Sequence, residues 1–110
     1  MSAAASIQTG ADGTAALSGE LVFSTVSALA GKSEVLLSAD KPLNTLDLQA
    51  VSRVDSSGLA LLLEWQSMAK AQGLSLEIRN APADLARLAR LCEAEELLRL
   101  TPQESSPSPS

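Results

Sequence analysis

Residues 51–63 read Val-Ser-Arg-Val-Asp-Ser-Ser-Gly-Leu-Ala-Leu-Leu-Leu, and they pass from a strand pattern through a polar turn into an apolar helical pattern. The turn contains Asp55, Ser56, Ser57 and Gly58. Backbone N–H groups at a helix start lack partners within the helix, and the helix dipole is positive there. A hydroxyl at this place can cap the helix, contact an anion or carry a phosphate. The function therefore depends on which of these roles Ser56 and Ser57 have.

The helix after the turn is predicted to run to about Gln72, because Gly73 stands where a helix-terminating glycine is preferred. At 100° per residue, one side of this helix gathers enough apolar residues to face a core. These are Leu61, Leu62, Trp65, Met68 and Ala69.

A second line of side chains runs along the same helix, away from the centre of that core face. It contains Ser56, Leu59, Leu63, Gln66 and Lys70. A core-facing helix does not need a second apolar stripe, so one interpretation is a protein-docking surface with two contact leucines. The other interpretation is that Leu59 and Leu63 are buried under a neighbouring helix. The pattern alone leaves both open.

Strand patterns flank this helix. Residues 44–51 alternate, with Leu46, Leu48 and Ala50 on one face, and residues 74–79 alternate in the same way. Upstream, residues 4–9 and 14–21 are predicted to form a hairpin around the turn signal Gly10-Ala11-Asp12-Gly13.

Two further helices complete the pattern. The first is predicted from a cap at Ser24 through Leu37, with Gly31 inside it and a stop at residues 40–42. The second begins at Pro82, a residue favoured at the first helical position. Residues 94–101 are compatible with a short helix or a last edge strand.

The element order is therefore β-β-α-β-α-β-α, which predicts an α/β domain with a small mixed sheet and helices packed on it. We expect a single domain over residues 1–101. The remaining residues, 102–110, are rich in proline and serine and are predicted to be a disordered tail.

Charge and composition exclude several classes of function. The formal net charge is −5 and the eight basic residues are scattered, which argues against a nucleic-acid surface and against docking on anionic lipid. No run approaches the roughly 18 apolar residues of a membrane span, and the first residues lack a signal-peptide pattern. We expect a cytoplasmic protein without direct membrane insertion.

The chain contains no histidine, so Ser-His and Cys-His nucleophile pairs and histidine metal sites are excluded. Its single cysteine, Cys92, falls in an apolar helical pattern and is expected to be a buried, unreactive thiol. We expect no catalytic residues, no metal and no cofactor.

The turn and its flanks resemble a known family. Asp55-Ser56-Ser57-Gly58-Leu59, after an apolar strand and at the start of a helix, is similar to the signature of STAS domains, and Gly19-Glu20-Leu21 is similar to a motif of the family's early strand. Val22 departs from the aspartate that is common after that motif. Residues 51–55, 58–63 and 69–73 most resemble the small STAS subunits of bacterial phospholipid-transport ABC complexes.

This resemblance implies a non-catalytic subunit that binds the ATPase subunit of an ABC transporter at the inner face of the inner membrane. It also implies a role in outer-membrane lipid asymmetry. It places the hydroxyl residue that matches Ser56 at the partner contact. Combined with the helical pattern, it leads us to expect a partner-binding surface of Ser56, Ser57, Leu59, Leu63, Gln66 and Lys70.

The same resemblance includes anti-sigma-factor antagonists, in which the serine matching Ser56 is phosphorylated by a kinase. Ser56 is therefore a candidate phosphorylation site, and Ser57 resembles the antagonists, since the transporter subunits often have glycine there. An antagonist function remains the alternative.

Overall fold

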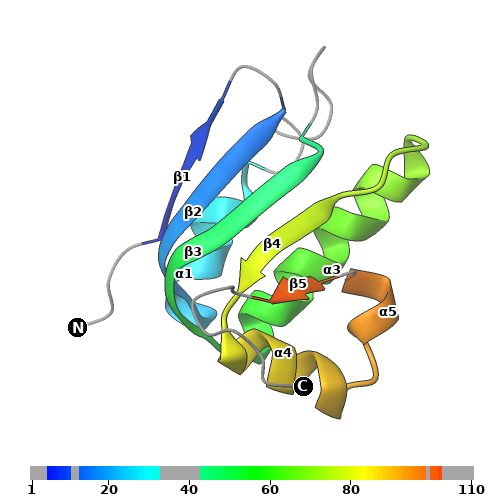
Figure 1. Cartoon of the computed structure of the whole chain (residues 1–110). Helices are drawn as coiled ribbons and strands as arrows, with labels where there is room; N and C mark the ends of the chain where they lie inside the picture. Colours follow the sequence, from blue (N-terminus) through cyan, green and yellow to red (C-terminus); the bar gives the residue numbers. More distant parts are fainter. Residues whose placement is uncertain (1–4, 11–12, 33–42, 99, 103–110) are drawn as a thin grey trace.

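A five-stranded sheet forms the centre of the computed structural model, which describes residues 5–10, 13–32, 43–98 and 100–102. Its strands lie side by side in chain order (Figure 1). They are β1 (Ser6–Thr9), β2 (Thr14–Leu21), β3 (Thr45–Val54), β4 (Glu77–Ala81) and β5 (Leu100–Pro102). β1 is antiparallel to β2, and the other neighbouring pairs are parallel. The expected mixed sheet is confirmed.

Helices connect the parallel strands. They are α1 (Phe23–Ala30), α3 (Ser56–Ala71), α4 (Ala83–Leu91) and α5 (Glu95–Leu98). α1 and α3 lie side by side across one face of the sheet, and α4 lies at the end where β4 finishes (Figure 1). The predicted α/β class and element order are confirmed, and the C-terminal residues form both the short helix and the edge strand that were alternatives.

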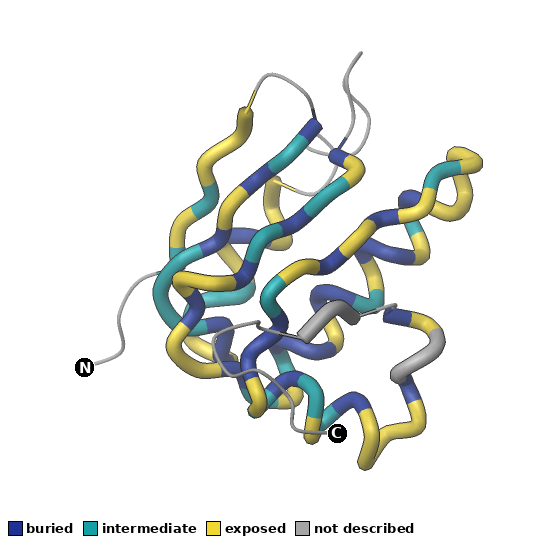
Figure 2. Tube along the Cα trace, viewed as in Figure 1, coloured by how far each residue is buried: buried dark blue, intermediate teal, exposed yellow. Residues whose placement is uncertain are grey.

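The hydrophobic core lies between the sheet and this helical layer. Trp65 of α3 is fully buried in it, together with inward-facing leucines of β2 and β3. Along the strands buried and less buried positions interchange (Figure 2), because successive side chains of a strand point to opposite faces. The core is aliphatic apart from this one indole.

β3 departs from simple alternation, and the prediction for Ala50 is wrong. Relative to β2, β3 contains one extra residue between Asp47 and Ala50 and another between Val51 and Arg53. Each such irregularity exchanges the faces of the residues that follow. Ala50 is therefore exposed, and Val51 and Val54 are buried in its place.

The helix predicted from Ser24 to Leu37 is also revised. α1 begins at Phe23, with Val22 at its N-cap, and ends at Ala30, with Gly31 as its C-cap. Ser24 is therefore not the cap. Residues 33–42, including the expected stop, lie outside the described residues.

The C-terminal part of the chain differs from expectation at two residues. Pro82 is the N-cap of α4 rather than its first residue. α4 ends at Leu91, and the next residue, Cys92, has φ −95° and ψ 5°. Cys92 therefore lies beyond the end of the helix whose periodicity predicted its burial, and it is exposed. Of the expected tail, Pro102 belongs to β5, and residues 103–110 lie outside the described residues.

Candidate functional site: the Asp55–Ser56 turn and the outer face of α3

The carboxylate of Asp55 holds the starts of two helices. One oxygen accepts hydrogen bonds from the backbone N–H groups of Ser57 (2.8 Å) and Gly58 (3.2 Å), so Asp55 is the N-cap of α3. The other oxygen accepts from the N–H of Phe23 (3.1 Å), the first residue of α1. The backbone N–H of Asp55 donates to the carbonyl of Leu21. One residue thus joins the end of β2 to the starts of α1 and α3.

Gly58 allows the first turn of α3 to pack directly against the sheet. A Cβ atom at this position would lie 2.4 Å from the carbonyl oxygen of Leu21 and 2.9 Å from a methyl of Val54. No real side chain fits at such distances, so the absence of a side chain sets the height of the turn above the strands.

Ser56 and Ser57 project from this turn without supporting it. Ser56 is exposed and Ser57 is half-buried. Among the described residues neither hydroxyl has a hydrogen-bond partner, because Asp55 supplies the capping oxygens. Of the three uses of a hydroxyl at this place, capping is therefore taken by Asp55, and the two serine hydroxyls are available to other molecules.

Two members of the predicted docking line lie in the interior instead. Leu59 is only 3% exposed and belongs to the core. Gln66 is 8% exposed. Its amide nitrogen donates to the carbonyls of Leu76 and Leu98, and its amide oxygen accepts from the N–H of Leu76. For Leu59 the burial alternative is confirmed, because α3 is covered by the sheet and by flanking helices on both sides, which widens its buried face. Gln66 borders the groove described below, but its amide group is bonded to these backbone groups.

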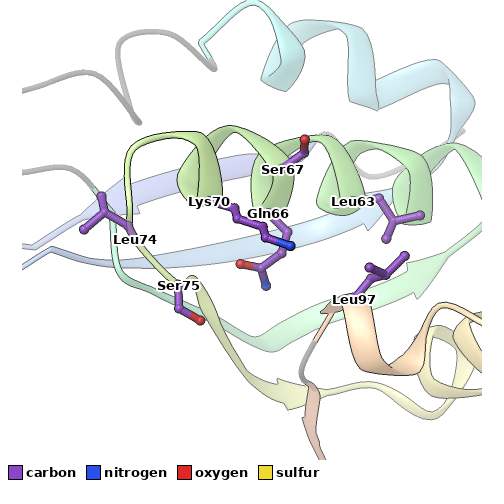
Figure 3. A pocket seen from close by; sticks show the side chains of 7 residues that line it. All are labelled: Leu63, Gln66, Ser67, Lys70, Leu74, Ser75 and Leu97. Carbon is purple, nitrogen blue, oxygen red and sulfur yellow. The ribbon is translucent and has the colours of Figure 1, made fainter.

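Leu63 and Lys70 remain at the surface. Leu63 is half-buried and Lys70 is exposed, and both line a groove of about 650 Å³ between α3, the chain before β4 and α5. Figure 3 shows Leu63 beside Leu97 of α5 at one end of this groove and Lys70 further along α3. Within the described part of the chain Lys70 has no ion pair. The predicted line is thus reduced to Ser56, Leu63 and Lys70 on the outer face of α3, with Ser57 beside it.

A further surface residue, Phe23, was not singled out from the sequence. Its side chain is 81% exposed, the highest value among the large hydrophobic residues at the described surface. Its backbone bond to Asp55 places it beside the turn formed by residues 55–58, which we call the serine turn. The available signal was compositional, since Phe23 is the single phenylalanine of a chain that has only one other aromatic residue.

The described residues contain neither a metal-ligand cluster nor a membrane-spanning helix. No cluster of three or more acidic, cysteine or histidine side chains with the spacing of a metal site was found there. None of the helices described is both long and apolar enough for a membrane span.

Comparison with known proteins places the chain in a family. A family model described as "Mlab, STAS domain" matches residues 5–100. The chain is 40% identical over 78 residues to the intermembrane phospholipid transport system binding protein MlaB of Escherichia coli (strain K12). That alignment covers 71% of this chain and 77% of the relative, and MlaB of Shigella flexneri matches to the same extent.

Solved structures share the fold at lower identity. The unphosphorylated form of the anti-sigma factor antagonist SpoIIAA superposes with a TM-score of 0.69 at 17% identity, over 93% of this chain and 90% of that one. An anti-sigma factor antagonist from Mycobacterium paratuberculosis gives 0.67 at 22% identity, over 94% and 88%. These two likenesses concern the fold alone. From the match of the family model and the identity to MlaB, the chain belongs to the STAS domain family, in its MlaB group.

Proposed function

We propose that this chain is a non-catalytic accessory subunit of an intermembrane phospholipid transport system. It binds the cytoplasmic, MlaF-like ATPase subunit of an ABC transporter and supports the assembly and activity of that complex, and so outer-membrane lipid asymmetry. The observation that carries the proposal is the 40% identity to MlaB over most of both chains. Bound to this partner, the chain lies at the inner face of the inner membrane.

The surface proposed for this contact is the serine turn and the outer face of α3. Ser56 and Ser57 lie at the N-terminal end of α3, and Leu63 and Lys70 follow along the helix. The free hydroxyls supply hydrogen bonds and the leucine supplies apolar contact, the mixture found at ordinary protein interfaces. A subunit that binds only the folded ATPase stabilises it by mass action.

Copurification tests the proposal. Tagged full-length chain should bring down an ABC ATPase from its own cell. Leu63→Asp should abolish this capture while circular dichroism shows a folded domain, because a carboxylate would be desolvated against the partner. Leu91→Asp is the matched control, since Leu91 is 75% exposed on α4 and should leave capture unchanged. Absence of any ABC ATPase with the unaltered chain would contradict the proposed function.

The alternative function is an anti-sigma-factor antagonist switched by phosphorylation of Ser56. The observation that favours it is the exposed Ser56 side chain, whose hydroxyl no described residue binds. Phosphate there would add nearly two negative charges at a helix start that tolerates them, so its effect would fall on the partner. In the same copurification, a serine kinase in place of an ATPase supports this alternative, as would neighbouring genes for a kinase and a sigma factor.

A further inference from the structure

α1 has an outer face unlike those of the other long helices. Only Leu29 among its residues is buried, and none of the residues from Val22 to Gly31 is charged. α4, in contrast, carries Asp84, Arg87 and Arg90. A helix on the surface of a domain usually presents charged side chains to water.

The exposed residues of α1 are all small except one. They are Phe23, Ser24, Ser27, Ala28 and Ala30. Interface centres are depleted of charged residues and enriched in aromatic ones, and a phenyl ring contributes a large apolar area at little conformational cost. Phe23 lies at one end of this uncharged face as its single large side chain.

The fold itself does not explain Phe23. The ring is 81% exposed, so it contributes little to the core. Nor does α1 need this side chain in order to begin, because the carboxylate of Asp55 satisfies the Phe23 N–H and the hydroxyl of Thr25 satisfies the N–H of Val22. Only the backbone of Phe23 takes part in the fold.

The position of Phe23 indicates its partner. The bond between its N–H and Asp55 places Phe23 at the end of the helical layer where α3 begins with Ser56, and α1 packs beside α3 (Figure 1). The uncharged face of α1 is thus continuous with the surface proposed for the ATPase subunit. A partner that covers the serine turn also covers Phe23.

We propose that Phe23 is the central anchor of the contact with the ATPase subunit, which receives the ring in an uncharged, apolar pocket and covers the outer face of α1. This inference rests on the proposed function. It moves the centre of the interface from the middle of α3 to the junction of α1 and α3. Few residues of an interface supply most of its affinity, and buried aromatic anchors are prominent among them.

The affinity of the full-length chain for the purified ATPase subunit tests this, measured by calorimetry. Phe23→Ser should raise Kd at least about tenfold, and Phe23→Tyr should retain most of the affinity because the ring remains. Leu91→Ser is the matched control, since it removes an exposed leucine of similar accessibility from α4 and should leave Kd within about twofold. The thermal midpoint of Phe23→Ser should equal that of the unaltered chain.

The outcomes separate the two proposals. If the unaltered chain binds and Phe23→Ser binds equally well, the inference is overturned while the proposed function stands. If the unaltered chain does not bind the ATPase, the proposed function fails and the inference falls with it. If Phe23→Ser does not fold, Ser27→Glu decides, because it places a charge on the same exposed face of α1: a similar loss supports the inference, and unchanged affinity overturns it.

Discussion

At the scale of single residues, the serine turn divides its tasks between neighbours. Asp55 makes the side-chain capping bonds at the start of α3 and one bond to the start of α1, and Gly58 makes room for the strands below. Ser56, which lies between them, has neither duty, and this frees its hydroxyl for a partner. A motif of adjacent polar residues thus combines structural positions with functional ones.

Gly58→Ala should lower the free energy of unfolding by about 2–3 kcal/mol, although alanine is the better helix former. The reason is the 2.4 Å approach to a backbone oxygen, which cannot rotate away. Urea denaturation followed by circular dichroism measures the change. Gly31→Ala is the control: its added Cβ would meet nothing closer than 3.6 Å, and stability should stay equal or rise slightly. Equal stability of Gly58→Ala and the unaltered chain would contradict the packing argument.

At the scale of elements, α3 and α4 end in the same way with different residues. After α3, Gly73 has φ 75°. The N–H of Gly73 donates to the carbonyl of Lys70, and the N–H of Leu74 donates to the carbonyl of Ala69. After α4, Glu93 has φ 56°, and the N–H of Ala94 donates to the carbonyl of Ala89. Both are helix ends that favour glycine, because a Cβ strains the left-handed backbone. α4 therefore ends at a strained residue.

Glu93→Gly should raise the free energy of unfolding by about 0.5–1 kcal/mol, since relief of the left-handed strain exceeds the added freedom of the unfolded chain. A thermal or urea melt reads the change. Gly73→Ala is the mirror control and should destabilise by a similar amount, because no atom lies within 4 Å of its added Cβ and only backbone strain acts. A destabilised Glu93→Gly variant would show that the Glu93 side chain has a role of its own.

At the scale of the whole molecule, one core joins all the layers. Trp65 is buried at its centre, and the next residue, Gln66, ties α3 to the chain before β4 and to the end of α5. The helical layer covers one sheet face, while strand residues such as Gln49, Arg53 and Arg79 face water on the other. With a single core, unfolding should be cooperative.

Urea unfolding followed by Trp65 fluorescence and by far-ultraviolet circular dichroism should therefore give one transition with a common midpoint. Gln66→Ala removes bonds to three buried backbone groups and should shift both curves together to lower urea, by about 2–4 kcal/mol in unfolding free energy. If fluorescence changes at lower urea than circular dichroism, α3 opens separately and the core is not one cooperative unit.

The sequence by itself determined the features that local rules control. The start of α3 at the Asp55 turn, its end at Gly73 and the N-terminal hairpin depend on bonds between residues close in the chain, and each was predicted. The family also followed from the sequence, because the turn motif is short and contiguous. Of the candidate site, the placement of Ser56 and Lys70 at the surface was predicted in the same way.

Only the tertiary structure decided which side chains are covered. Leu59 and Gln66 are buried because other elements pack against α3. Ala50 faces water because β3 contains an extra residue relative to β2. Phe23 is exposed because nothing in the described chain packs over it. Helical and strand periodicity gives a residue's direction around its own element. Burial depends on which other segments pack against that side of the element, and these segments are far away in the sequence.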